Sequence, residues 1–140
     1  MQNKIRVALY CRVAREDDEA IKKQEIMLRQ FAEKNDYKNI SIYFDNGFSG
    51  LNFNRPVFQR LNEDIYAGLI ETVIVKDISR ISRNYIDMLK WVNNIRSIGV
   101  SLKSVSNDLP DTDVDETINP LYQLINDYRI KQKRRNRRTK

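Results

Sequence analysis

The sequence contains no histidine and a single cysteine, Cys11, among its 140 residues. A structural zinc site needs several Cys or His ligands, so we do not expect a zinc-stabilised fold. One cysteine cannot form an internal disulfide and fits a reducing compartment. No apolar run approaches the roughly 20 residues that a membrane-spanning helix requires, and the first residues lack the apolar stretch of a signal peptide. We therefore expect a cytoplasmic protein without a metal and without membrane contact.

Positive charge is concentrated at one end of the chain. The net charge is +6, but eight of the 25 Lys and Arg residues lie in residues 129–140, which contain no acid. The first 128 residues thus carry 17 basic and 19 acidic side chains, a balance of −2. Such a tail can bind nucleic acid by neutralising phosphates. The alternative is a solvated terminus that only aids solubility.

Apolar runs and helical patterns alternate along the chain. Strands are predicted near residues 5–11, 40–44, 71–76 and 100–105, and helices near 18–35, 56–67, 83–98 and from about 119 onwards. This alternation favours an α/β fold with a mostly parallel sheet and helices on both faces. The length suits one domain. We expect that domain to cover residues 1–128, with residues 129–140 continuing the last helix as a basic tail and no separate DNA-binding domain.

The helical periodicity also predicts which side chains pack on the sheet. The first helix aligns Ile21, Leu28, Phe31 and Ala32 on one face. The third helix aligns Tyr85, Leu89, Val92 and Ile95. In the third helix, Trp91 is expected to pack against the sheet or against a partner subunit. Cys11, at the end of the first strand, is interpreted as a small buried apolar residue.

Several arginines follow the predicted strands. In open parallel sheets the active site lies beyond the carboxyl ends of the strands, which here are residues 10–14, 45–50 and 76–83. The arginines near these ends are Arg12, Arg55, Arg80 and Arg83. Four guanidinium groups in one place repel each other unless they meet an anion, and a phosphodiester suits their planar geometry. The alternative is that each pairs with a nearby acid, such as Asp17, Asp18, Asp45 or Asp77.

Three segments at these strand ends resemble motifs of the serine recombinases, the family of resolvases, invertases and large integrases. They are Tyr10-Cys11-Arg12-Val13-Ala14, the segment from Asp45 to Pro56, and the segment from Val75 to Asn84. The third has the form used by large recombinases and conjugative-transposon enzymes. Gln24 stands where the family carries a helix glutamine. The resemblance covers about residues 4–128.

The resemblance implies a resolvase-like three-layer fold with four to five strands and a long C-terminal helix. It implies that DNA is cut and rejoined through a phosphoserine intermediate, in a tetramer, without a metal or nucleotide cofactor. Carried over residue by residue, it assigns catalytic roles to Arg12, Arg80 and Arg83. It assigns contacts to DNA phosphates to Tyr10, Gln24, Arg55, Ser79, Arg129 and Lys131.

The sequence departs from the family pattern in two places. Ala14 occupies the position of the nucleophilic serine, and a methyl group cannot attack phosphorus. Ser49, Ser79 and Ser82 lie nearby but at other family positions, and misplacement by about 1 Å can cost about a hundredfold in rate. Relatives also carry a Tyr-Ala-Arg triplet near the last helix, where this chain has Arg129-Ile130-Lys131. We therefore expect a recombination protein that does not cleave DNA as it stands.

Two other functions are compatible with the sequence. The first is a non-enzymatic module that binds DNA and regulates or assembles with an active recombinase. The second is a magnesium-dependent nuclease or receiver-like domain, in which Asp45 and Asp77 would form a metal-binding pair. A helix is predicted over about residues 119–135, and its apolar positions predict self-association as a homodimer or tetramer. This expectation applies to both the recombinase hypothesis and the module hypothesis.

Overall fold

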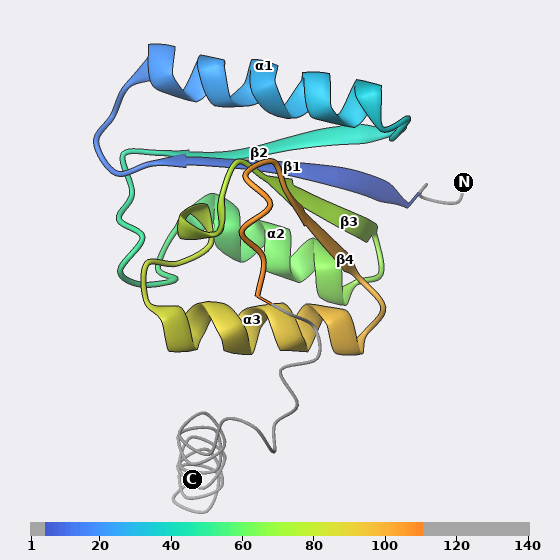
Figure 1. Cartoon of the computed structure of the whole chain (residues 1–140). Helices are drawn as coiled ribbons and strands as arrows, with labels where there is room; N and C mark the ends of the chain where they lie inside the picture. Colours follow the sequence, from blue (N-terminus) through green and yellow to red (C-terminus); the bar gives the residue numbers. More distant parts are fainter. Residues whose placement is uncertain (1–4, 111–140) are drawn as a thin grey trace, which may run out of the picture. The chain divides into compact units, whose positions relative to one another are not determined.

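One sheet of four parallel strands carries helices on both faces (Figure 1). The structure is a computed structural model that describes residues 5–110. The elements are β1 (Arg6–Val13), α1 (Asp18–Lys34), β2 (Ile40–Asn46), α2 (Pro56–Tyr66), β3 (Ile70–Val75), the 3₁₀ turn η1 (Ile78–Arg80), α3 (Tyr85–Ser97) and β4 (Ser101–Ser104). These bounds confirm the predicted α/β class and place each strand and helix within a few residues of its expected position. Within residues 5–110 the sheet has four strands, and the long C-terminal helix predicted from about residue 119 lies outside the described residues.

The strand order is β2-β1-β3-β4. The chain leaves β1 toward β2 and then returns past β1 to β3, so the direction of winding reverses at β1. Right-handed crossovers require the helices on the two sides of such a reversal to cover opposite faces. Figure 1 shows this arrangement, with α1 on one face and α2 and α3 on the other. The carboxyl ends of β1 and β3 flank the reversal point, where open α/β sheets bind their ligands.

The central strand β1 is buried on both faces, which explains its continuous apolar run. Val7, Leu9 and Cys11 belong to the apolar core that α1 completes with buried Ile21, Leu28 and Ala32. Phe31 packs against this core but is only partly buried. Cys11 has no exposed surface, and burial raises the pKa of its thiol to about 12. The interpretation of Cys11 as a packing residue is consistent with this burial.

The predicted apolar face of α3 is correct for Leu89, Val92 and Ile95, which are buried, and wrong for Tyr85, which is 56% exposed. Tyr85 lies on the same stripe by angle, but it is the first residue of the helix. It borders an open cleft there, so a helical period alone could not reveal that no partner covers it. Trp91 packs on Phe58 of α2, and its indole N–H donates to Asn62 Oδ1 at 2.7 Å.

The two ends of the chain are not part of this description. Arg129, Lys131, the basic tail and the surface expected to mediate self-association lie outside the described residues. Within residues 5–110, no helix is long and apolar enough to cross a membrane.

We predict that Leu28→Ala lowers the free energy of unfolding by about 2–5 kcal/mol, because a fully buried side chain would leave a cavity between α1 and the sheet. Its neighbour Met27 is 36% exposed and provides a matched control, for which Met27→Ala should cost less than about 1 kcal/mol. Urea unfolding of both variants measures the difference. Equal losses would contradict the packing of α1 described above.

Candidate active site

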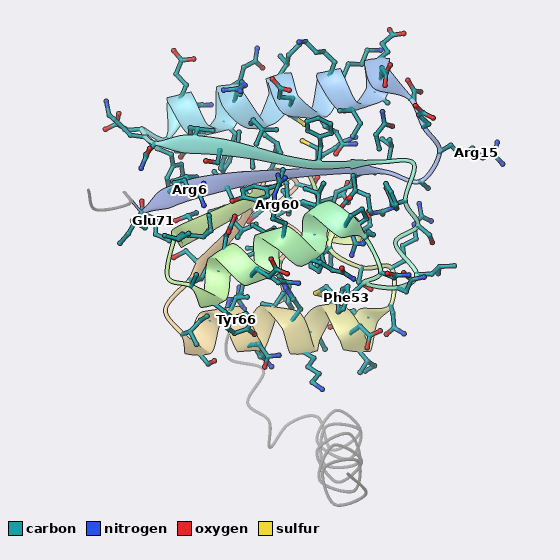
Figure 2. All side chains as sticks on the ribbon, turned by 180° about the vertical axis from the view of Figure 1, so that it is seen from behind. Arg6, Arg15, Phe53, Arg60, Tyr66 and Glu71 are labelled. Carbon is teal, nitrogen blue, oxygen red and sulfur yellow. The ribbon has the colours of Figure 1, made fainter. Side chains whose placement is uncertain are left out.

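Three loops meet where β1 ends. The loop after β2 contacts β1 through the N–H groups of Gly47 and Phe48, which donate to Val13 O at 2.9 and 3.0 Å. The same loop contacts the segment after β3, because Arg83 N–H donates to Gly50 O at 2.7 Å. The three segments predicted from the sequence to converge are thus brought together. Figure 2 shows this end of the sheet, with Phe53 beside it and Arg15 projecting away from the domain.

Arg12 lies at the centre of this contact, with no exposed surface. Its guanidinium donates to three backbone carbonyls on two loops. Nη1 donates to Phe48 O at 3.0 Å, Nη2 to Ser79 O at 2.7 Å, and Nε to Arg80 O at 3.2 Å. The side chain therefore joins the loop after β2 to the turn after β3.

Arg55 is also fully buried and makes a second connection of the same kind. Its guanidinium donates to the carbonyls of Asn52 at 3.2 Å, of Arg80 at 2.7 Å and of Ile81. The guanidinium carbon lies 4.4 Å from the ring centre of Phe58 and 5.7 Å from those of Phe53 and Tyr10. Aromatic faces stabilise a desolvated cation, which helps to explain how this arginine is buried without a direct ion pair to a carboxylate.

Tyr10 and Asp45 complete the buried network. Tyr10 Oη donates to Asp45 Oδ2 at 2.7 Å and accepts from Arg55 Nη1 at 2.9 Å, and burial raises the pKa of this phenol well above its usual value. Asp45 also accepts from Val57 N–H and Phe58 N–H at 3.0 and 2.9 Å. It thus caps α2, whose own N-cap residue, Arg55, makes no side-chain capping bond.

The metal-binding alternative has no support in this arrangement. Asp45 is engaged by Tyr10 and by α2, while Asp77 accepts from Ser79 Oγ and Ser79 N–H and pairs with Arg80. β1 lies between β2, which contains Asp45, and β3, which precedes Asp77. Across residues 5–110, no group of three or more Cys, Asp or Glu residues is placed to hold a metal ion.

The four predicted arginines form one electrostatic cluster, which we call the arginine cluster: Arg12, Arg55, Arg80 and Arg83. The pKa of Arg12 falls to about 10, first because of burial and then because of the positive charges of Arg55, Arg80 and Arg83. Burial also lowers the pKa of Arg55. A guanidinium with a pKa of about 10 is still charged at neutral pH. The cluster is therefore cationic, and its members repel each other.

Only two members of the cluster reach the surface. Arg80 is partly exposed and donates through Nη1 to Arg12 O at 3.0 Å, while its Nε lies 3.6 Å from Asp77 Oδ2 and makes no hydrogen bond. Arg83 is exposed, and no hydrogen bond or ion pair within residues 5–110 involves its guanidinium. Among the residues that the structure describes, the acid-pairing alternative holds for Arg80, whereas Arg12 and Arg55 bond to carbonyls instead.

The remaining predicted residues occupy distinct places. Ala14 is exposed directly after β1. Ser49 Oγ accepts from Leu51 N–H, Ser79 Oγ donates to Asp77, and buried Ser82 accepts from Asn84 N–H. Gln24 is buried. Its Oε1 accepts from Arg12 N–H and its Nε2 donates to Arg12 O.

A cleft of about 430 Å³ beside Arg83 was not predicted. It is lined by Ile78, Ser79, Ser82, Arg83, Tyr85 and Met88. The exposed ring of Tyr85 at the start of α3 is its clearest feature. The sequence signal was the position of this tyrosine two residues after Arg83, but the helical pattern assigned it to the core.

Open parallel α/β domains bind their ligands in the crevice at the strand-order reversal point, and in this domain cationic side chains lie there. The sequence profile of the family described as "Resolvase, N terminal domain" matches residues 7–140. This chain belongs to that family, the serine recombinases, as its three motifs predicted.

The relatives are longer than this chain. A relative from Bacillus subtilis (strain 168) is 35% identical over 104 residues, which are 73% of this chain and 21% of that protein. A resolvase of Clostridium perfringens is 31% identical over 110 residues, which are 79% of this chain and 54% of that protein. The chain thus spans about a fifth to about half of the length of these relatives.

Solved structures show the same fold. The N-terminal catalytic domain of TP901-1 integrase is 27% identical, with a TM-score of 0.69 over 91% of this chain and 98% of that domain. A resolvase family site-specific recombinase from Streptococcus pneumoniae is 29% identical, with a TM-score of 0.66 over 97% of this chain and 95% of the other. These similarities confirm the resolvase-like fold.

We predict that Gly50→Ala lowers the free energy of unfolding by about 1–3 kcal/mol. A Cβ atom at Gly50 would lie 2.6 Å from Arg12 Nη2 and 2.9 Å from Arg12 Cζ. This guanidinium cannot yield easily, because three carbonyls hold it. Leu51→Ala at the adjacent, 70% exposed residue is the control. Thermal unfolding of both variants measures the difference in stability. If Gly50→Ala were as stable as the unchanged chain, the close packing of Arg12 against Gly50 would be refuted.

Proposed function

We propose that this chain is the catalytic-type domain of a DNA recombination protein and that it binds a DNA phosphate without cutting the strand. The observation that carries the proposal is the position of Ala14. It is exposed at the end of β1, in the family's nucleophile position and at the crevice that holds the arginine cluster. Arg80 and Arg83 are the cluster members able to reach an anion, while buried Arg12 and Arg55 add positive charge behind them.

The proposed chemistry follows from the missing hydroxyl. In an active relative, a serine oxygen would attack phosphorus, and the 3′ oxygen of the DNA would leave as the phosphoserine bond to the 5′ end forms. The number of phosphate esters does not change, so rejoining needs no nucleotide cofactor. Guanidinium groups would neutralise the charge that develops on the phosphate. The arginine cluster supports binding of the phosphate, whereas the methyl group of Ala14 offers no atom that can attack it.

The same observation supports a second candidate function. A domain that retains the arginine cluster but lacks the serine could act as a non-enzymatic DNA-binding or assembly module. It would join a homodimer or tetramer, or a complex with an active recombinase. The two candidates differ in whether one hydroxyl restores cleavage.

We predict that Ala14→Ser restores formation of a phosphoserine adduct, because the arginine cluster and the fold around position 14 are present. The chain and its Ala14→Ser variant should each be fused to the DNA-binding domain of a relative. Each fusion is then incubated with a suicide substrate of that relative, without magnesium. Denaturing electrophoresis should show a covalent adduct that forms slowly for Ala14→Ser, and no adduct for the unchanged chain.

Two controls make this result interpretable. Ala14→Gly should form no adduct, and Arg83→Ala in the Ala14→Ser protein should reduce adduct formation. An adduct from the unchanged chain would refute the assignment of the nucleophile position. A folded, DNA-bound Ala14→Ser protein without an adduct would favour the non-enzymatic module.

We also predict weak and nearly sequence-independent DNA binding by the chain alone, mainly through residues 129–140. If about five phosphates are neutralised, the affinity should fall several-hundredfold between about 50 and 200 mM salt. Deletion of residues 129–140 should flatten this dependence in a fluorescence anisotropy titration. An unchanged slope after deletion would show that the tail is not the main DNA contact.

A further inference from the structure

The central strand β1 extends further than its neighbour β3. On the β2 side, pairing continues to Val13 and Asn46, whereas on the β3 side it ends at Tyr10 and Val75. Backbone groups of successive residues point to opposite sides of a strand, and Val13 O accepts bonds from the loop on the β2 side. The N–H and C=O of Arg12 therefore point to the side where β3 has ended. Without a partner these buried groups would destabilise the strand end.

The side chain of Gln24, on α1, is a partner for both groups, and Arg80 Nη1 is a second donor to Arg12 O at 3.0 Å. Arg12 N–H donates to Gln24 Oε1 at 3.2 Å, and Gln24 Nε2 donates to Arg12 O at 2.9 Å. A carboxamide offers one acceptor and a donor side by side, as a peptide group does. Gln24 is 4% exposed. Its amide thus replaces the missing strand at the residue two places before Ala14.

The backbone that leads into position 14 is consequently fixed on both sides. Gln24 holds Arg12 on one side, and the N–H groups of Gly47 and Phe48 hold Val13 O on the other. We propose that Gln24 is a positioning residue, which fixes the Arg12 peptide and so directs the side chain at position 14 into the crevice. It acts through the backbone and does not contact the phosphate. This role in a reaction rests on the proposed function, whereas the clamp on Arg12 can be tested without it.

The first test uses the chain with Ala14 in place and measures amide hydrogen exchange by NMR. Gln24→Met has a similar length but can neither accept from Arg12 N–H nor donate to Arg12 O. Exchange at Arg12 should become about 5- to 13-fold faster, because the opening of this amide loses a hydrogen bond of about 1–1.5 kcal/mol. Gln30→Met, at an exposed position of the same helix, should leave it unchanged. Unchanged exchange at Arg12 in Gln24→Met would overturn the proposal.

The second test separates positioning from phosphate contact in the fused Ala14→Ser protein. Gln24→Met should slow single-turnover adduct formation by about 10- to 100-fold, since small displacements of a reacting group have effects of this size. DNA affinity, measured separately, should stay within about twofold, because none of the phosphate-reaching side chains changes. Equal losses of affinity and rate would instead indicate a direct phosphate contact and would overturn the proposal. An unchanged rate would also overturn it.

Two safeguards separate the possible failures. Exchange at the amides of Leu9 and Val75 reports whether the sheet remains folded, and Gln24→Leu provides a second apolar variant if Gln24→Met does not fold. If Ala14→Ser itself forms no adduct, the proposed function fails. The exchange experiment still confirms or refutes the clamp on Arg12 in that case.

Discussion

The structure depends on the burial of two cationic side chains at the end of a parallel sheet. Arg12 and Arg55 have no exposed surface, and each donates to backbone carbonyls of loops that follow different strands. A buried charge is very costly unless hydrogen bonds replace its hydration. The loops are therefore held in the conformation that supplies these carbonyls, and Gly50 is required where Arg12 passes closest to the chain.

The burial of two arginines also means that the members of the arginine cluster have different roles. Arg12 and Arg55 form the framework, whereas Arg80 and Arg83 reach the surface. The pKa of Arg12 is lowered first by burial and then by the charges of the other three arginines, and a bound anion would offset that repulsion. The proposed phosphate site is thus preorganised by interactions among protein groups alone. The function retained without a serine at position 14 would be binding and assembly.

Apolar runs and helix signals predicted the strands, the helices and the convergence of the arginines, because parallel strands place their carboxyl ends at one edge. The hydrogen-bond acceptors of those arginines could not be predicted, because they are backbone carbonyls. Every residue carries a carbonyl, and the sequence does not show which of them an arginine contacts. The capping of α2 by Asp45 depends on contacts between distant segments, as does the clamp of Gln24 on Arg12. Tyr85 was misassigned because periodicity gives the angle of a side chain around a helix but not whether a partner lies beneath it.

The division between framework and phosphate-binding arginines is tested most directly by NMR of the arginine Nε–H groups during titration with a short DNA duplex. The account predicts that the Arg80 and Arg83 signals shift as DNA binds. The Arg12 and Arg55 signals should keep their positions and slow exchange, because their Nε–H groups remain bonded to Arg80 O and Asn52 O. Large shifts or rapid exchange at Arg12 and Arg55, with little change at Arg80 and Arg83, would contradict it.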